Sequence, residues 1–388
     1  MDNNEDAHSC DHSTSDASSL IAEKLPNRNN IIRGQKHSYA VGHKIAQGRF
    51  GAVYEVLRRG DGKHFAAKLE VCDSHFHGLN MDYTVLKYAN RASLKHFCQL
   101  VDRGKIEGHF KFMVMQLLTD NIDRYRQEFQ GNRFSAPTCI RLGLEMFNAL
   151  EEVHSLGYVH RDVKPSNFVI YEEKGQTHVY IIDFGLCKQY RNSSGEMRNP
   201  REKAQFRGTV RYASLAAHNE NEQAPKDDLE SWLYVLIEFF TGELPWTHYR
   251  KSEKHMVKQL KEQARTSEGA HELLKYCPRT EFRRIMKYLD GLGYHSTVDY
   301  TFIRQLIHLA MKNYDIKADQ PYDWQIEDSE LESSTTPRGH SSNSSTDGRS
   351  DVSPNHKPTV SEKLEKAVQK MNGLTVNDQP NGRMQNGK

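Results

Sequence analysis

Two short stretches decide the fold: HRDVKPSN at residues 160–167 and DFG at residues 183–185. The apolar run VYII, at residues 179–182, directly precedes the second stretch and predicts a strand that leads into it. The first stretch supplies a carboxylate and an amide, and the second supplies another carboxylate. Carboxylate and amide oxygens are ligands that Mg²⁺ prefers in proteins. Any single acid could merely cap a loop or helix, but the two stretches together are specific.

These residue types fit phosphoryl transfer. One carboxylate must orient an incoming hydroxyl and accept its proton, and Asp162 is the candidate for this role. A second carboxylate, Asp183, and the amide oxygen of Asn167 would hold magnesium on the phosphates. Lys164, two residues after Asp162, would neutralise charge on the transferring phosphate. We therefore predict Asp162, Lys164 and Asn167 as catalytic residues, and Asn167 and Asp183 as metal ligands.

Upstream, IAQGRFGAV at residues 45–53 lies between two predicted strands. Small residues there would let a backbone turn approach phosphate oxygens without clashes from Cβ atoms. FAAK follows at residues 65–68, and Lys68 is the candidate phosphate anchor. A plain β-turn explains a glycine-rich stretch about as often, and a strand lysine is more often a solvated surface residue, so these two motifs need the others for support.

From Tyr39 to about Trp324 the chain resembles the eukaryotic protein kinases, and more narrowly the casein kinase 1 group. The narrower resemblance rests on KPSNF, RGTVRYAS, DDLES and LPW, which begin at residues 164, 207, 227 and 244. MQL, GTVRYAS and YDW, which begin at residues 115, 208 and 322, are similar to the tau-tubulin kinase branch. That branch phosphorylates microtubule-associated substrates.

The resemblance implies an α+β bilobal kinase fold. We expect a small antiparallel-sheet N-lobe at about 36–117 and a mainly helical C-lobe at about 118–328. An antiparallel hairpin is expected where Ala52–Val56 and His64–Leu69 flank a turn cluster. Residues 1–35 and 329–388 lack the periodic apolar pattern of packed elements, so we predict a disordered N-terminal tail and a disordered, Ser/Thr-rich C-terminal tail.

The resemblance also implies ATP and Mg²⁺ as cofactors. Met115 would lie at the back of the adenine pocket, with backbone groups of Gln116 and Leu118 available to the adenine edge. The full set of residues predicted to bind the nucleotide is Ile45, Ala46, Gly48, Gly51, Val53, Ala66, Lys68, Asp82, Met115, Gln116, Leu118 and Asp183.

Two positions depart from the kinase pattern. Ala46 stands where the glycine-rich loop usually has its first glycine, and Asp82 stands where a glutamate usually pairs with the strand lysine. Aspartate is one methylene shorter, so Lys68 could be held less firmly. The favoured function is an active serine/threonine protein kinase. The alternatives are a nucleotide-binding pseudokinase scaffold, or a protein whose tails do the biological work.

Composition limits partners and location. The formal net charge is +2 for 388 residues, so no global basic field points to nucleic acid. No apolar run approaches the ~20 residues of a membrane span, and residues 1–20 have no secretory pattern. We expect a monomer in the cytoplasm, and also in the nucleus, acting on acidic, primed or microtubule-associated protein substrates. The substrate expectation rests on basic residues Lys188, Arg191, Arg198, Arg201, Lys203, Arg207 and Arg211.

Overall fold

The computed structural model describes most of the chain, namely residues 21, 23–72, 78–192 and 194–326. The chain divides into two compact units. The first comprises residues 1–124 and 145–199, and the second comprises residues 125–144 and 200–388. The predicted C-terminal tail lies outside the described residues, as do residues 1–20 of the predicted N-terminal tail.

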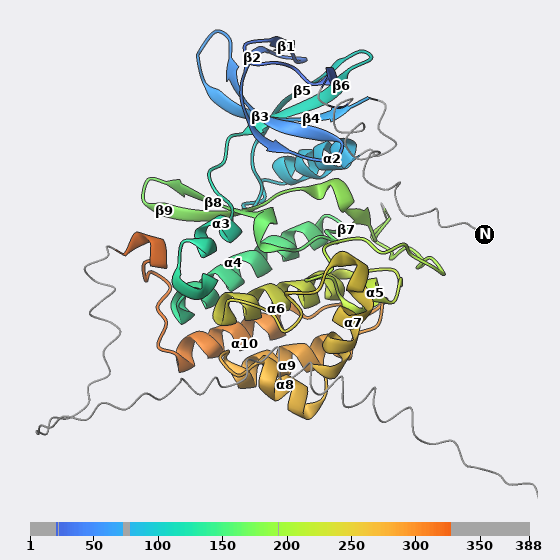
Figure 1. Cartoon of the computed structure of the whole chain (residues 1–388), viewed down its shortest axis with the longest axis vertical. Helices are drawn as coiled ribbons and strands as arrows, with labels where there is room; N and C mark the ends of the chain where they lie inside the picture. Colours follow the sequence, from blue (N-terminus) through green and yellow to red (C-terminus); the bar gives the residue numbers. More distant parts are fainter. Residues whose placement is uncertain (1–20, 22, 73–77, 193, 327–388) are drawn as a thin grey trace, which may run out of the picture. The chain divides into compact units, whose positions relative to one another are not determined.

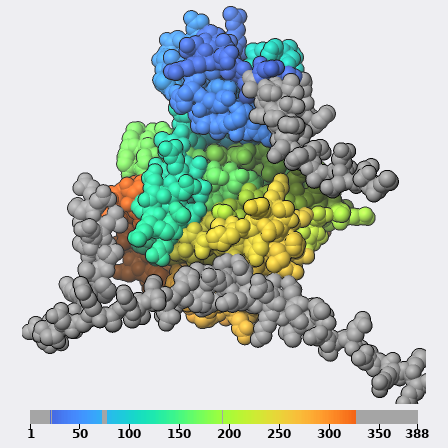
Figure 2. Space-filling model, in the orientation of Figure 1, coloured from blue at the N-terminus to red at the C-terminus, as the bar shows by residue number. Residues whose placement is uncertain are grey.

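The first unit contains a six-stranded antiparallel sheet with the strand order β1-β2-β3-β4-β6-β5. These strands are labelled in Figure 1 and form most of the blue part of the space-filling view in Figure 2. Their bounds are β1 Ile31–Arg33, β2 Ser38–Gln47, β3 Gly51–Arg58, β4 His64–Val71, β5 Leu100–Ile106 and β6 Phe110–Gln116.

The predicted hairpin is formed by β3 and β4, which pair from Gly51 with Glu70 to Leu57 with His64. Alternate residues of β3, namely Ala52, Tyr54 and Val56, are buried, as expected of a strand with one face on a core. The connecting turn needs positive φ angles, and glycines at residues 60 and 62 supply them. Local turn chemistry and alternation therefore specify this hairpin.

The structure corrects the predicted end of the N-terminal tail. Residues 31–33 form β1, which pairs with β2, and the side chains of Leu25 and Ile32 are buried in the core of the sheet. Too few apolar residues lie before Tyr39 for a periodic pattern to be visible in the sequence. Only the finished sheet gives Leu25 and Ile32 something to pack against.

Helix α2 (Gly78–Arg91) lies beside the sheet (Figure 1) and contacts β4, β5 and β6. The N–H of Leu79, in the first turn of this helix, donates to the carboxylate of Glu70 at 2.8 Å. The remaining elements of the first unit are two small antiparallel ribbons and two short 3₁₀ turns, which lie in and beside the HRDVKPSN and DFG stretches. They are β7 Tyr158–Val159 with β10 Lys188–Gln189, β8 Phe168–Glu173 with β9 Gln176–Ile181, η2 Pro165–Asn167 and η3 Phe184–Leu186.

The second unit is mainly helical, and α6 (Pro225–Thr241) is its most buried helix. Proline at the first position and Asp227, which accepts the N–H of Ala224 at 2.8 Å, begin this helix, and Gly242 ends it with φ 83°. Its Trp232 donates to the carbonyl of Gly143 at 2.8 Å. The other helices of this unit are α5 Leu215–His218, α7 Lys254–Gln263, α8 Ser267–Leu273, α9 Arg279–Asp290 and α10 Tyr300–Asn313.

The α+β fold class is confirmed, with an antiparallel sheet in one unit and helices predominating in the other. Helices α3 (Ile122–Gln127) and α4 (Ala136–Ser155) each contribute residues to both units. The units do not divide at the predicted lobe boundary of 117/118, because residues 145–199 group with the sheet. Contacts between α2 and η3 explain this grouping. Within the described part of the chain, no helix combines the length and apolar character that a membrane crossing requires.

Candidate nucleotide-binding and catalytic site

Lys68 lies on β4, opposite Val53 of β3 and Met113 of β6. Its Nζ is 2.7 Å from Oδ2 of Asp82 and 2.9 Å from Oδ1 of Asp183. A strand lysine with an aliphatic stem among apolar neighbours would ordinarily extend to solvent. Here two carboxylates, one from α2 and one from the DFG stretch, hold its ammonium group in place.

The three charges perturb one another. Burial opposes the charged form of Lys68, but the carboxylates of Asp82 and Asp183 outweigh burial and raise the pKa of this lysine. The ammonium group of Lys68 in turn lowers the pKa of Asp183 to about 2. Burial raises the pKa of Asp82, an effect that Lys68 opposes. Asp183 is therefore an anion at neutral pH, as a cation ligand must be.

Asp82 makes a second contact that the sequence did not predict. Its Oδ1 accepts the backbone N–H of Phe184 at 2.7 Å, while its Oδ2 faces Lys68. The Phe184 ring is buried and stacks on Phe97 with 5.4 Å between ring centroids. One carboxylate thus joins β4, α2 and the DFG stretch, and the shorter side chain reaches both partners.

The catalytic loop brings its predicted residues together. Lys164 Nζ lies 2.8 Å from Oδ2 of Asp162. The side-chain amide of Asn167 donates to the Asp162 carbonyl at 2.8 Å and to its carboxylate at 3.3 Å. Because the amide nitrogen faces Asp162, the amide oxygen is the atom of Asn167 suited to bind a cation. Pro165 begins the short 3₁₀ turn that contains Asn167.

His160 connects this loop to the DFG stretch. Its Nδ1 accepts the N–H of Asp162 at 3.3 Å, and its Nε2 is 3.1 Å from the carbonyl oxygen of Ile182. These partners place the imidazole proton on Nε2. Asp183 itself has φ 64° and ψ 70°, a left-handed conformation that aspartate tolerates better than most residues. The backbone thus turns sharply where its carboxylate enters the site.

All residues predicted to bind nucleotide or metal line one cavity of about 610 Å³ within the first unit. This volume suits a small-molecule ligand or cofactor. The residues it brings together are Ile45, Ala46, Gly48, Gly51, Val53, Ala66, Lys68, Asp82, Met115, Gln116, Leu118, Asn167 and Asp183. Asp162 and Lys164 adjoin the cavity through the hydrogen bonds of Asn167.

Sequence reasoning missed part of the apolar lining. Val169, Ile182, Leu86 and Cys98 also line the cavity. Val169 lies on β8, two residues after Asn167, and Ile182 directly precedes Asp183, so proximity in sequence to predicted site residues could have indicated both. No comparable signal marks Leu86 or Cys98.

The peptide N–H of Gln116 donates to the carbonyl of Gln99 at 2.9 Å. This N–H was among the backbone groups expected to face an adenine edge. Because this N–H already donates within the protein, it is not available to bind an adenine edge.

The glycine-rich turn shows which small residues the backbone requires. Ala46 pairs with Val53 in the β2–β3 ladder and is absent from the residues with positive φ, so alanine fits its described conformation. A Cβ on Gly48 would make only an ordinary contact, 3.6 Å from the Gly51 carbonyl. A Cβ on Gly51 would lie 1.8 Å from the carbonyl oxygen of Leu69. Gly51 is thus required by strand packing, whatever binds in the cavity.

The cavity has the donor set that a magnesium–nucleotide needs. An anionic carboxylate, an amide oxygen and a lysine ammonium converge in it, and apolar side chains form the rest of the lining. These residues therefore fit ATP and Mg²⁺.

Several of the basic residues expected to face a substrate have acidic partners within the second unit. Arg201 lies 2.6 Å from Glu222 and Lys203 lies 3.3 Å from Glu220. Arg211 Nη1 lies 3.3 Å from the buried carboxylate of Glu238. These ion pairs reduce the basic charge that this part of the segment can offer to a substrate anion.

The family described as the protein kinase domain matches residues 39–313, well over half of the chain. The chain belongs to this family.

Two relatives support the assignment. A probable serine/threonine-protein kinase of Dictyostelium discoideum is 33% identical over 299 residues, which cover 77% of this chain and 58% of that protein. The serine/threonine-protein kinase spe-6 of Caenorhabditis elegans is 29% identical over 305 residues, which cover 78% of this chain and 79% of that protein. The chain thus spans little more than half the length of the Dictyostelium relative.

Proposed function

We propose that the protein is an active serine/threonine protein kinase, which transfers the γ-phosphoryl group of ATP to protein hydroxyl groups. The observation that carries the proposal is the arrangement around Lys68. Its Nζ lies within 2.9 Å of both Asp82 and Asp183, in the cavity that contains all predicted nucleotide contacts. Contacts this short require β4, α2 and the DFG stretch to be correctly packed against one another.

Each residue has one role in this proposal. Bound ATP with Mg²⁺ supplies the phosphoryl group and the charge that polarises it. Lys68 holds nucleotide phosphates, and Asp183 and Asn167 hold the metal. Asp162 orients the substrate hydroxyl and accepts its proton at the carboxylate, while Lys164, 2.8 Å away, neutralises charge that develops on the transferring group. Most of the rate acceleration then comes from positioning and charge neutralisation.

The finer assignment is to the casein kinase 1 group and its tau-tubulin kinase branch. The motifs RGTVRYAS at residues 207–214 and YDW at residues 322–324 support it. We accordingly propose acidic, primed or microtubule-associated proteins as substrates. The ion pairs of Arg201, Lys203 and Arg211 leave less of the expected basic surface to select them.

The alternative is a nucleotide-binding pseudokinase scaffold, which the departures at Ala46 and Asp82 favour. The geometry weakens both arguments. Ala46 occupies a backbone conformation open to alanine, and Asp82 reaches Lys68 despite its shorter side chain. These two positions therefore favour the pseudokinase less than the sequence alone suggested.

Labelling with radioactive ATP and Mg²⁺ tests the proposal. The full chain is incubated with casein and with a tubulin-associated protein, beside an Asp183→Asn variant that removes a proposed metal ligand. We expect phosphoserine and phosphothreonine with the native chain and only background with the variant. Equal background from both proteins, together with stabilisation of the native chain by ATP, would establish the pseudokinase instead.

A further inference from the structure

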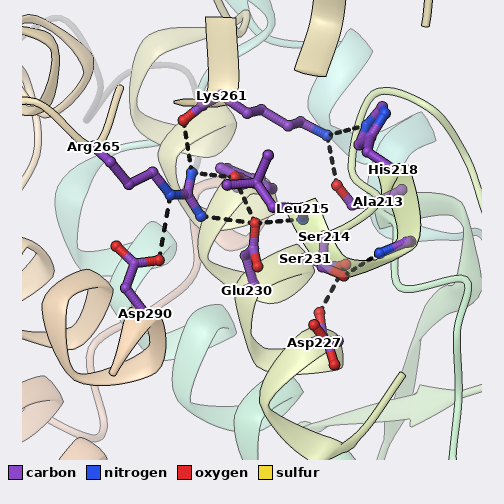
Figure 3. A network of polar contacts seen from close by, with 12 residues as sticks. Ala213, Ser214, Leu215, His218, Asp227, Glu230, Ser231, Lys261, Arg265 and Asp290 are labelled. Carbon is purple, nitrogen blue, oxygen red and sulfur yellow. Dashed lines mark hydrogen bonds and ion pairs between the residues drawn. The ribbon is translucent and has the colours of Figure 1, made fainter. Parts of the chain in front are cut away.

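Lys261, on α7 of the second unit, is fully buried, with 0% of its surface exposed. Its Nζ donates to the carbonyl oxygens of Ala213 at 2.6 Å and Val210 at 3.0 Å. It also lies 3.2 Å from Nε2 of His218. Figure 3 shows this side chain extended from α7 toward Ala213 and His218. Lysine is almost never fully buried unless it is paired, so this position needs an explanation.

The three hydrogen-bond partners of Lys261 are neutral. Burial and the nearby charge of Lys261 lower the pKa of His218 to about 3, so this imidazole is uncharged at neutral pH. Two N–H groups of Lys261 donate to these carbonyls, and Nζ also faces Nε2 of His218, which itself lies 3.3 Å from the Val210 carbonyl oxygen. The rings of Tyr234 and Trp246 lie 4.8 and 5.3 Å from Nζ and add cation–π stabilisation.

Burial also lowers the pKa of Lys261 itself, so the site is costly for a cation. An apolar side chain would fill the same volume at a smaller cost. Unlike an apolar side chain, lysine donates hydrogen bonds to two backbone carbonyls that lie three residues apart. Those carbonyls belong to the RGTVRYAS stretch, which the nucleotide site does not use.

Other side chains hold the same stretch. Trp246 donates its indole N–H to the carbonyl of Arg211 at 2.7 Å. The hydroxyl of Tyr212 donates to Glu238 at 2.8 Å. With Lys261, these contacts fix the carbonyls of Val210, Arg211 and Ala213. The stretch lies outside the helices and strands, so side chains rather than a regular hydrogen-bond ladder determine its shape.

A second anchor follows at the beginning of α5. Oε1 of Glu230 accepts the N–H of Leu215 at 2.9 Å and the guanidinium of Arg265 at 2.7 Å. Arg265 also donates to the backbone carbonyl of Lys261 at 3.1 Å and pairs with Asp290 at 3.3 Å (Figure 3). Lys261 of α7 thus holds the stretch itself, and Arg265, just after α7, holds the first residue of α5 through Glu230.

We propose that Lys261 is a positioning residue for the protein substrate, which it serves by fixing the backbone of residues 209–214. The proposal rests on the proposed kinase function and names a determinant of substrate affinity. Val210 and Arg211 are only partly buried, so the stretch has an accessible surface. The buried side chains that bond its backbone fix the shape of that surface. A loop held this rigidly can bind an extended peptide without a large ordering cost. Lys261 itself touches neither substrate nor nucleotide.

Lys261→Met tests the proposal, because methionine matches the lysine side chain as far as Cε and lacks the terminal nitrogen with its donors. With an acidic serine peptide and ATP as substrates, we expect the KM for the peptide to rise by on the order of tenfold. The KM for ATP should stay within about twofold, since the nucleotide cavity belongs to the first unit. Hydrogen exchange at the amides of Tyr212 and Ala213, which bond to the Thr209 carbonyl, should become faster.

Two controls separate positioning from general destabilisation. Lys258→Met removes the same charge from the same helix, where Lys258 pairs with Glu262, and should change neither KM. Ile285→Val shortens a buried side chain of α9 and should lower thermal stability without changing the KM for the peptide. If Lys261→Met does not fold, Lys261→Gln, which keeps two N–H donors on a shorter chain, is measured instead.

An unchanged KM for the peptide, with faster exchange or lower stability alone, would show that Lys261 only supports the fold and would overturn the proposal. Equal rises in both KM values would overturn it too. If the native chain transfers no phosphate, the proposed kinase function fails first. Peptide affinity measured by calorimetry then decides about Lys261, because that measurement needs no transfer: weaker binding by the variant supports the proposal, and equal binding or no binding by either protein refutes it.

Discussion

Lengthening Asp82 to glutamate should impair the enzyme, although glutamate is the usual kinase residue at this position. Both carboxylate oxygens of Asp82 are engaged at 2.7 Å, one with Lys68 and the other with the N–H of Phe184. The side chain is 1% exposed. One more methylene must therefore displace α2, Lys68 or the DFG backbone.

The cost can be estimated from packing. Inserting a methylene into a filled site costs about 1–3 kcal/mol, and each 1.4 kcal/mol corresponds to a tenfold change in an equilibrium or rate constant. If the strain falls on the Lys68 and Phe184 contacts, kcat/KM for ATP should fall by roughly 5- to 100-fold in Asp82→Glu. Asp82→Asn should also lose activity, because it removes the charge opposite Lys68 but keeps the shape.

The assay is phosphate transfer to a serine peptide at ATP concentrations far below KM, which gives kcat/KM directly. Asn80→Gln is the matched control, since it adds one methylene at an exposed position of the same helix and should leave kcat/KM within about twofold. Higher kcat/KM in Asp82→Glu than in the native chain would refute the reasoning. It would show that aspartate holds Lys68 poorly and that the contact with Phe184 contributes little.

Two further predictions concern stability. Burial lowers the pKa of His96, but the carboxylates of Glu145 and Glu152 outweigh burial and raise this pKa to about 9. Because the pKa of His96 is higher in the folded chain than in the unfolded chain, where it is about 6.5, protonated His96 stabilises the fold. This stabilisation is fully present below about pH 6.5 and is lost as the pH rises through about 9. Denaturant unfolding from pH 6 to pH 9.5 should show a loss of about 3 kcal/mol that His96→Gln abolishes, and an equal loss in the variant would contradict the assignment. Gly51→Ala should lower the free energy of unfolding by more than about 2 kcal/mol, because the added Cβ would lie 1.8 Å from the Leu69 carbonyl oxygen. Gly48→Ala should change it by less than about 0.5 kcal/mol, because its added Cβ would make only an ordinary contact at 3.6 Å. Equal unfolding midpoints for the two glycine variants would be inconsistent with this packing.

The chemistry-bearing residues could be predicted from the sequence because each lies in a short ordered motif. Asp162, Lys164 and Asn167 are close in sequence, and their mutual contacts follow from one loop and one 3₁₀ turn. The β3–β4 hairpin was equally predictable, since alternation and turn residues are local signals. The spacing of apolar residues and the turn composition also sufficed to predict an antiparallel sheet followed by helices.

The functional meaning of Asp82 could not be decided in this way. The sequence shows only that its carboxylate is one methylene short, whereas the contacts with Lys68 and Phe184 depend on where α2 packs. The same limit applied to Leu25 and Ile32, whose burial depends on a sheet built from distant strands.

The sequence by itself thus predicted the protein kinase family, the motifs and a set of residues that line one cavity, because these are encoded in contiguous stretches. Only the tertiary structure showed which contacts hold these residues in place. Lys261 illustrates the difference: in the sequence it is one lysine of a polar helix, and in the folded chain it is buried beneath residues 209–214. Burial and pairing arise from packing between segments far apart in the chain, and no local pattern specifies them.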